Sequence, residues 1–350
     1  MTSTRLLVSR GVLPYLVGFL AVGVVPLGAC GDTNVTVICN GGEAGDVNCE
    51  DGVCACTEEG IRDAITVGGG PFTFSCDGPT TVKTEAEIVI DNDVILDGEG
   101  NMTLDANGEH SVLWVHERVA AELRGFAVTG GNANALEEGN GGGIINDGDL
   151  TIADCSIREN VAFLGGGISN IGTLTLTRST VSGNSASRGG GIFNEGMATL
   201  TNSTISGNTD DGISNDGTMM LTSVTVDGYQ TPLFGISSDG TLTVMNSLIV
   251  SDCQGDIVSG GYNIESEGDS CGFDQVTDLV GATEQDLMLA PFADNGGPTE
   301  TRALLPGSVA IDHIPAMDCE VTTDQRGEPR PETGGDGCDV GSFERQPEDP

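Results

Sequence analysis

A short motif, Gly-Ile-x-Asn, recurs at a nearly fixed interval through the middle of the chain. Its isoleucines lie 24, 24, 21 and 23 residues apart, and each copy is followed by a glycine and an alternating segment such as Thr173–Thr177. A fixed period with several matched columns is the signature of a solenoid, in which equivalent residues stack from one coil to the next. The columns are the isoleucines Ile144, Ile168, Ile192 and Ile213, with a degenerate copy at Ile236, and the asparagines Asn146, Asn170, Asn194 and Asn215.

The residues between the motifs indicate what kind of solenoid this is. They alternate with a period of two and are rich in Thr, Val and Ile, as strands require, and the glycine runs allow sharp corners. Helical periodicity is missing between the strands, and the Leu-x-x-Leu-x-Leu framework of leucine-rich repeats is absent. We therefore predict a right-handed parallel β-helix, with the aliphatic columns inside and the asparagine column as an amide ladder at one corner.

Both ends of such a solenoid need caps, because they expose apolar core and unpaired strands. Ile61, Ala64 and Ile65 share one helical face just before the first coils, which predicts a short N-terminal cap helix. The period is lost from about Gly260, which predicts an irregular, disulfide-containing cap at the other end. The expected organisation is a signal peptide at 1–29, a Cys-rich segment with the cap helix at 30–80, the β-helix at 81–259, the C-terminal cap at 260–345 and a tail at 346–350.

The first thirty residues read as an export signal. Arg5 and Arg10 precede an apolar stretch at 11–25, which is too short to span a bilayer as a helix. The sequence Leu27-Gly28-Ala29-Cys30 resembles the lipobox of bacterial lipoproteins and implies cleavage before Cys30 and acylation of its thiol. Ordinary secretion is the alternative, but it requires a small residue where Leu27 stands.

The cysteine count agrees with export. Of eleven cysteines, setting Cys30 aside leaves ten, and an even set in an exported chain indicates disulfides. Local pairs are expected between Cys253 and Cys271 and between Cys319 and Cys338. Zinc is not expected, because the spacings do not fit and the chain has three histidines.

Charge narrows the range of partners. With 13 basic and 53 acidic residues, the net charge is −40, which argues against nucleic acid as a partner. An acidic surface suits a salty or calcium-containing exterior, where counterions screen repulsion. The Asp-Gly corners at Asp147 and Asp216 are candidate calcium ligands. We expect at most a modest stabilisation by calcium and no other cofactor.

Two parts of the sequence resemble known protein families. The Gly-Gly-Gly-Ile-x-Asn and Ser-Gly-Asn repeats resemble the β-helix repeats of polymorphic outer-membrane proteins. The ordered C-terminal segments resemble the choice-of-anchor Q module of bacterial surface proteins. That family has no established common activity, so the resemblance implies a location, and an N-terminal lipid would be the anchor. Arg326 and Asp339 are then expected as buried partners inside the cap. The matching segments are 261–264, 294–299, 307–312, 324–327 and 338–344.

Catalytic residues are sparse. Asn208-Thr209-Asp210-Asp211-Gly212 resembles a polygalacturonase motif, in which paired carboxylates act as acid and base. The two aspartates occupy a turn position, however, which favours a solvated turn or a calcium-binding corner. A lyase needs a cationic base, and the candidates are Arg158, Arg178 and Arg188, of which Arg178 shares a column with Asp154 and is expected to pair with it. The candidate catalytic residues are therefore Asp210, Asp211 and Arg188, and the sequence favours a non-catalytic role.

Outward threonine columns suggest a surface function. Thr151, Thr175, Thr199 and Thr243 form one column, and Thr177, Thr201 and Thr222 form a second. A flat threonine array can order water, bind glycans or bind ice, although threonine is also simply a good solvent-facing strand former. We expect a lipid-anchored protein of the cell envelope, in the outer membrane or at the cell surface, or extracellular if not lipidated. It would be a structural or adhesive scaffold with a glycan or an envelope protein as partner. The alternative is a carbohydrate-active enzyme, a polysaccharide lyase or hydrolase.

Overall fold

The computed structural model describes residues 49–133, 139–228, 234–266 and 268–349. The chain divides into two units, Met1–Gly45 and Asp46–Pro350, and every described residue belongs to the second. The predicted signal peptide, Cys30 and Cys39 lie outside the described residues. Among the helices described, none is long and apolar enough to cross a membrane.

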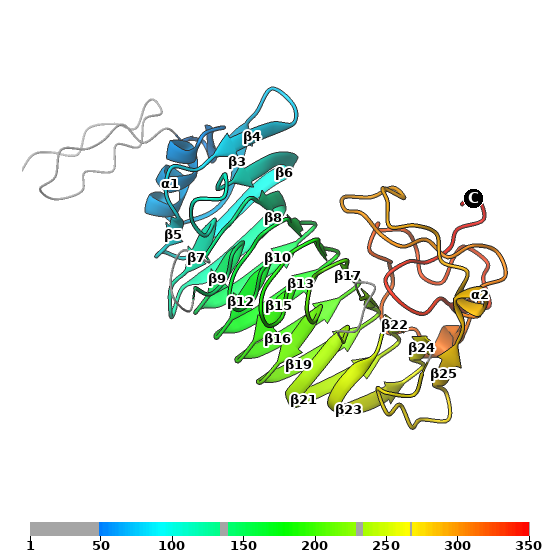
Figure 1. Cartoon of the computed structure of the whole chain (residues 1–350). Coiled ribbons are helices and arrows are strands. Elements are labelled where there is room, and N and C mark those ends of the chain that lie inside the picture. Colours follow the sequence, from blue (N-terminus) through cyan, green and yellow to red (C-terminus); the bar gives the residue numbers. More distant parts are fainter. Residues whose placement is uncertain (1–48, 134–138, 229–233, 267, 350) are drawn as a thin grey trace, which may run out of the picture. The chain divides into compact units, whose positions relative to one another are not determined.

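The described unit is a parallel β-helix, as predicted (Figure 1). Each central coil contributes three strands, and each strand pairs in parallel register with its equivalent one coil later. Ile144, for example, is the register partner of Ile168, and Ile168 that of Ile192. The four central coils are β9(Ile144–Asn146), β10(Asp149–Ala153) and β11(Ser156–Arg158); β12(Ile168–Asn170), β13(Thr173–Thr177) and β14(Thr180–Ser182); β15(Ile192–Asn194), β16(Met197–Thr201) and β17(Thr204–Ser206); and β18(Ile213–Asn215), β19(Thr218–Thr222) and β20(Thr225–Asp227).

Strands outside these coils continue the sheets in both directions. On the N-terminal side they are β1(Cys49–Glu50), β2(Val53–Ala55), β3(Gly69–Ser75), β4(Thr80–Lys83), β5(Ile88–Ile90), β6(Val94–Asp105), β7(Leu113–Val115) and β8(Ala120–Thr129). On the C-terminal side they are β21(Ile236–Met245), β22(Leu248–Val250), β23(Cys253–Gly261), β24(Ile264–Ser266) and β25(Leu279–Ala282). Parallel pairing begins between β2 and β3 and reaches β25, so parallel strands are found on both sides of residues 81–259.

Apolar columns fill the interior. Ile152, Leu176, Leu200, Leu221 and Val244 succeed one another in register, and each is fully buried. Burying an aliphatic side chain of this size contributes about 1.5–3 kcal/mol relative to leaving it exposed. Because each column repeats from coil to coil, the core is continuous along the solenoid.

Two asparagine ladders brace the corners. In the first, the Asn146 amide donates to Asn170, Asn170 to Asn194, and Asn194 to Asn215, over 2.6, 2.6 and 2.7 Å. In the second, Asn160 donates to Asn184 and Asn184 to Asn208, both over 3.0 Å. All these side chains are buried, so each bond satisfies polar groups that water cannot reach.

A helix covers the N-terminal end. Helix α1(Glu58–Val67) begins at Thr57, whose hydroxyl accepts a hydrogen bond from the Gly60 amide over 3.1 Å. Its buried face carries Ile61, Ala64 and Ile65, the three residues whose spacing predicted it. Disulfides between Cys49 and Cys54 and between Cys56 and Cys76 tie the adjoining strands together.

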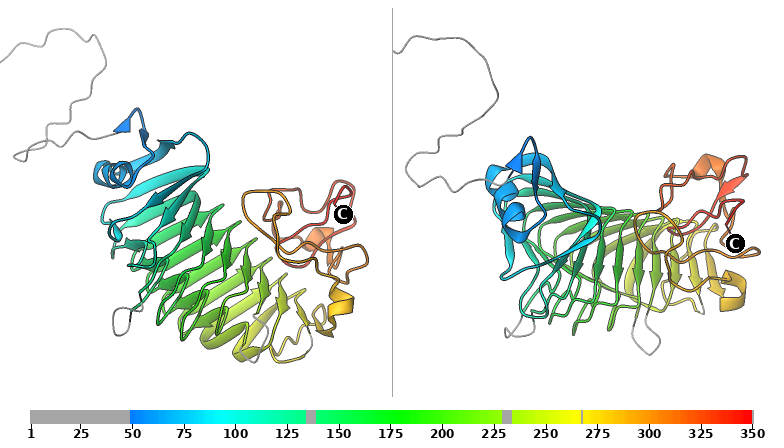
Figure 2. Two further views of the ribbon diagram at one scale, coloured as in Figure 1. Left: turned by 45° about the horizontal axis from the view of Figure 1, so that its top comes forward. Right: turned by 90° about the horizontal axis from the view of Figure 1, so that it is seen from above.

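Beyond the last coils the chain is irregular and carries the Cys319–Cys338 disulfide, as predicted, and most of it lies beside the solenoid. Strands β24 and β25 and helix α2(Glu284–Leu287) continue the last coils, but residues 290–349, here called the lateral module, lie beside the solenoid (Figures 1 and 2). The module docks there because an outward column of β14, β17 and β20 offers hydroxyl groups. Gln325 and Ser342 hydrogen-bond to Thr204 over 2.7 and 2.8 Å, and Ser342 also bonds Thr225. Its short elements are β26(Ile314–Pro315), η1(Ala316–Asp318) and β27(Gly337–Cys338).

Disulfides join Cys253 to Cys271 and Cys319 to Cys338, the two local pairs expected from the sequence. The inference that all ten remaining cysteines are paired is wrong for Cys155, which is unpaired and buried. Cys155 faces the core, where its sulfur accepts from the Phe126 amide over 3.3 Å. Burial raises the pKa of the Cys155 thiol to about 12, so the thiol stays protonated and serves as a core side chain.

Candidate functional site

The three candidate catalytic residues lie at one corner of the solenoid. Arg188 donates to Asp216 over 2.8 Å, lies 3.6 Å from an oxygen of Asp239 and stacks on the Phe193 ring. Burial and then the charge of Asp210 raise the pKa of Asp211, while Arg188 lowers it. The structure therefore brings Arg188 and Asp211 together, but two other carboxylates already neutralise the guanidinium.

The candidate calcium ligands have protein partners instead. Asp147 accepts a hydrogen bond from the Trp114 indole over 2.8 Å, and Asp216 is bound to Arg188. Within the described ranges, no group of three or more His, Cys, Asp and Glu side chains is arranged to hold a metal ion. The calcium corners at Asp147 and Asp216 stay predictions.

The remaining arginine candidates differ from each other. Arg178 forms two hydrogen bonds with Asp154 of the preceding coil, over 2.8 and 2.6 Å, as the shared column predicted. Arg158 lies one coil before Ser182 and interacts with its neighbour Glu159 at 3.5 Å. About a third of its side chain stays exposed, and it lines a cleft.

A flat sheet face runs over β13, β16, β19 and the end of β21. We call it the threonine face, and its twelve outward residues are Thr173, Thr175, Thr177, Met197, Thr199, Thr201, Thr218, Met220, Thr222, Thr241, Thr243 and Met245. None is buried, and Met197 and Met220 are 58% and 44% exposed. The methionines interrupt the threonine columns, so the face mixes hydroxyl, methyl and thioether groups. It carries no charged residue in a chain with 53 acidic residues.

A cleft of about 660 Å³ lies between the lateral module and the solenoid, beside the place where they dock. Its solenoid side comprises Arg158, Glu159, Ser182, Gly183, Ser206 and Gly207, and its module side comprises Phe292 and Glu300. Sequence reasoning missed this site, because nothing in the period indicates where the aperiodic residues after 260 fold back. The sequence indicates Arg158 as a candidate base but does not indicate which residues face it across the cleft.

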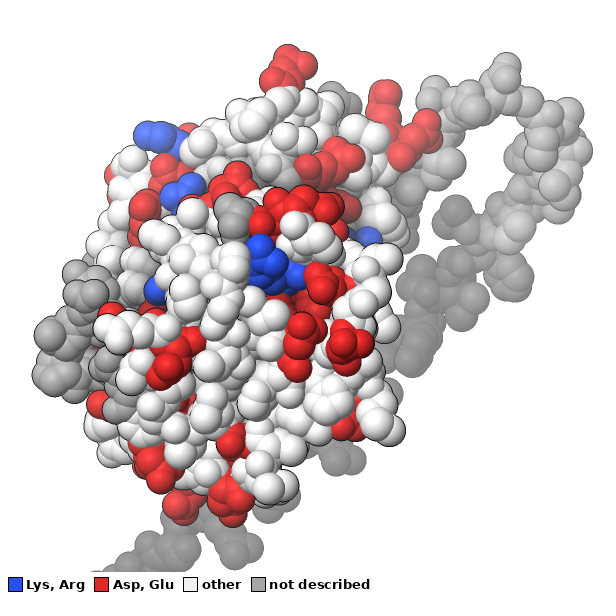
Figure 3. Space-filling model, turned by 90° about the vertical axis from the view of Figure 1, so that its right-hand side faces the viewer, with Lys and Arg blue, Asp and Glu red and all other residues white. Residues whose placement is uncertain are grey.

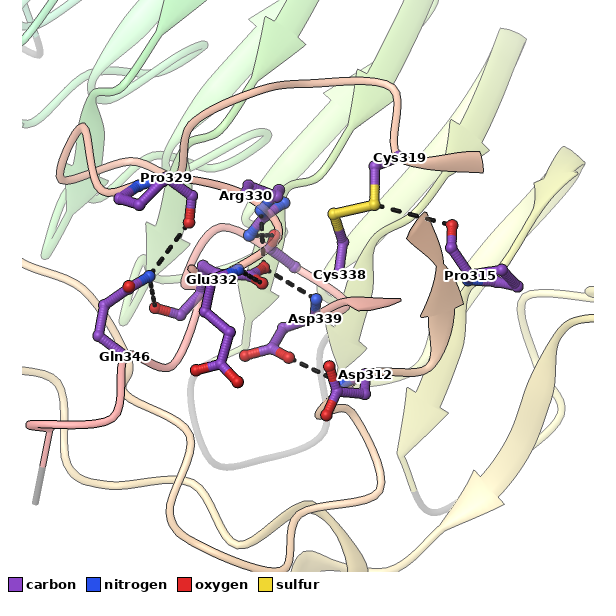
Figure 4. Close-up of a disulfide and its surroundings, with 11 residues drawn as sticks. Asp312, Pro315, Cys319, Pro329, Arg330, Glu332, Cys338, Asp339 and Gln346 are labelled. Atoms are coloured by element: carbon purple, nitrogen blue, oxygen red, sulfur yellow. Dashed lines mark hydrogen bonds and ion pairs between the residues drawn. A yellow bond between two sulfur atoms is a disulfide. The ribbon is translucent and has the colours of Figure 1, made fainter. Parts of the chain in front are cut away.

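The interior of the lateral module holds a buried ionic cluster (Figure 4). Arg330 contacts Glu344 at 3.0 Å with both side chains about 1% exposed, and the Asp339 carboxylate accepts from the Asp312 and Arg345 amides. Arg326 binds Asp324 over 2.9 Å and stacks on Phe343. The side chains of Arg326 and Asp339 are thus both buried inside the module, each with its own partners, as expected from the sequence.

Burial raises the pKa of Glu344 to about 8 and that of Asp339 to about 6. The charge of Arg330 opposes both shifts, whereas Asp339 raises the pKa of Glu344 further and Asp312 raises that of Asp339. On the outer surface at this end of the molecule, acidic side chains are spread widely and basic ones are few (Figure 3).

No protein-family model matches the chain, and no curated protein sequence matches it. One solved structure, the crystal structure of pectate lyase Pel9A, matches with a TM-score of 0.46 and 12% sequence identity, covering 81% of this chain and 90% of that one. This likeness is too distant to carry an argument about the fold or the activity. The fold rests on the strand register, and the two family resemblances stay predictions.

Proposed function

We propose that this protein is a lipid-anchored scaffold of the cell envelope whose threonine face adheres to neutral polysaccharide. One observation carries the proposal: twelve adjacent outward positions over four coils are uncharged, although the chain has a net charge of −40. Four disulfides among the described residues support an oxidising compartment such as the cell exterior.

The face suits a polysaccharide surface on physical grounds. The threonine hydroxyls form no hydrogen bonds to other described residues, so they can bond sugar hydroxyls, while their methyl groups and Met197 and Met220 can contact sugar C–H faces. Adsorption onto a neutral polymer would require no charged group to lose its water, which avoids the largest desolvation cost. The continuous strands and both asparagine ladders keep the face flat and rigid.

Binding is better supported than cleavage. A polysaccharide lyase requires a cationic base, and all three candidates, Arg158, Arg178 and Arg188, form ion pairs with carboxylates. A hydrolase requires two carboxyl groups on either side of a bound glycosidic bond. Asp210 and Asp211 are instead consecutive residues at a corner, and neither lines the cleft beside the lateral module.

The test is adsorption to insoluble cellulose, chitin and mannan, with pectate as the acidic comparison, together with an assay for released sugar. The double variant Thr175→Lys/Thr199→Lys places two charges at the centre of the face and should lower adsorption to neutral polymers at least tenfold. Thr81→Lys/Thr103→Lys is the matched control, because this stacked pair is in register with β8 and β11 and so lies on a different face of the solenoid from β13 and β16. Equal adsorption by both variants would contradict the proposal, and sugar release by the native protein would favour the enzyme.

A further inference from the structure

The cleft beside the lateral module arises from how the module docks. Thr180, Thr204 and Thr225 stand in one outward column, and the module covers it: the Thr180 hydroxyl donates to the Glu300 carbonyl over 2.7 Å, and Gln325 reaches both Thr180 and Thr204. The next outward column, two residues along each strand, holds Arg158, Ser182 and Ser206, which line the cleft; Arg158 is partly exposed, and the two serines are 7% and 4% exposed. The cleft therefore runs along the solenoid axis, across successive strands.

The floor of the cleft repeats from coil to coil. Arg158, Ser182 and Ser206 are register partners, so their backbones lie about 4.8 Å apart. The residues next in sequence to these three are Glu159, Gly183 and Gly207, and all have positive φ. A Cβ atom at either glycine would meet only open space. The second asparagine ladder lies directly behind these corners and holds them in place. The floor is thus preorganised and periodic.

The opposite wall comes from the module. Phe292 is half-buried and Glu300 is exposed, and both line the cleft. The backbone at Glu300 is anchored, because its carbonyl accepts bonds from Thr180 and from Gln325 over 2.7 and 3.1 Å. One coil later, the register partner of Ser206 is Asp227. The Asp227 carboxylate forms an ion pair with Arg302 of the module and accepts a hydrogen bond from the Ser206 hydroxyl. A ligand would therefore lie between a fixed floor and a fixed wall.

The lining groups select the class of ligand. One guanidinium, two carboxylates, two hydroxyls and one aromatic ring are a set that recognises sugars, whose hydroxyls donate and accept hydrogen bonds and whose C–H faces stack on aromatic rings. Glu159 and Glu300 outnumber Arg158, and the chain is strongly acidic, so the cleft disfavours a polyanion. The coil spacing is close to the length of one sugar ring, which suits a polymer lying along the axis.

We propose that this cleft binds a neutral oligosaccharide chain, aligned with the solenoid axis at about one sugar per coil. This site is distinct from the threonine face, which presents a flat surface and no cavity. The cleft inference rests on the proposed glycan-binding function and extends it to soluble oligosaccharides. Its test is separate from the test of adsorption to solid polymer.

The experiment is calorimetric titration of the native protein with the hexasaccharides of β-1,4-linked glucose, mannose and galactose, and with hexagalacturonate. We expect one or more of the neutral chains to bind and hexagalacturonate to bind at least tenfold more weakly. Phe292→Ala and Arg158→Gln should each weaken the neutral interaction at least tenfold. Phe163→Ala and Arg118→Gln are the matched controls, because both side chains are exposed outside the cleft.

The outcomes separate the two proposals. If no neutral hexasaccharide binds, if hexagalacturonate binds best, or if the cleft variants bind like the native protein, the cleft inference is wrong. Because Phe292 is partly packed, its variant is checked by circular dichroism, and the Arg158 variant gives a second measurement on the solenoid side. If Phe292→Ala and Arg158→Gln lose hexasaccharide binding but keep adsorption to solid polymer, the threonine face and the cleft are independent sites.

Discussion

At the scale of single residues, the asparagine ladders show how a repeated side chain becomes a structural element. Asn170 is completely buried, accepts from Asn146 and donates to Asn194. Its amide also donates to the carbonyls of Gly172 and Met197 over 3.2 and 3.1 Å. One side chain therefore joins three coils, and no apolar residue of similar size can replace it without leaving buried partners unsatisfied.

Asn170→Ala should consequently lower the free energy of unfolding by about 2 kcal/mol, the cost of leaving buried polar partners unsatisfied. Urea unfolding followed by circular dichroism measures the change. Asn101→Ala is the control, because Asn101 is exposed and its amide donates only to the nearby Glu99 carbonyl. Its effect should stay within about 0.5 kcal/mol. Equal losses for the two variants would show that the ladder contributes nothing specific.

The ladder could be predicted from sequence, whereas the surroundings of Arg188 could not. A residue in a regular coil has its neighbours set by the period, so Asn146 and Asn170, or Arg178 and Asp154, can be paired by counting. Arg188 lies at a corner of uneven length, and its partner Asp216 is 28 residues away, outside the exact repeat. The same irregularity hid the fact that Asp147 and Asp216 already have partners.

At the scale of elements, the lateral module is the part that periodicity could not place. Its contacts with the solenoid join residues about 120 positions apart, such as Thr180 with Glu300. The sequence loses its period after Gly260 although parallel pairing continues to β25, and an aperiodic segment carries no register, so it does not specify where the segment docks. The cleft, which depends on that docking, was missed for the same reason.

The ionic cluster of the module predicts a pH dependence. A carboxyl group whose pKa is higher in the folded chain than in the unfolded chain stabilises the fold at low pH and loses that contribution as the pH rises through the folded pKa. For Glu344 this range runs from its ordinary pKa of 4.5 to about 8. The free energy of unfolding should therefore fall on the order of 2 kcal/mol between about pH 5 and pH 8.

Thermal unfolding across that pH range tests this expectation. Glu344→Gln cannot ionise, so its stability should vary less with pH than that of the native protein. Glu328→Gln changes an exposed glutamate of the same module and should keep the native slope. A native stability that rises with pH, or an unchanged slope in Glu344→Gln, would show that the cluster is not the titrating element.

At the scale of the whole molecule, charge decides how the protein can be held at a membrane. A chain with a net charge of −40 and one lysine, Lys83, is repelled by anionic lipid headgroups, so basic residues cannot provide the attachment. A covalent lipid adds about 0.8 kcal/mol per buried CH₂ and does not depend on charge. The proposed acylation of Cys30 would thus attach the protein without a basic surface.

Cys30→Ser should then move the protein from the membrane fraction to the soluble fraction of the producing cells. Mass spectrometry of the N-terminal peptide should find acyl groups on Cys30 in the native protein. Cys39→Ser is the matched control and should leave the protein in the membrane fraction, because Cys39 lies outside the lipobox. A Cys30→Ser protein that stays with the membranes would mean that the anchor lies elsewhere. A native protein found only in the medium, with its N-terminus at Cys30 and unmodified, would mean that the segment directs ordinary secretion.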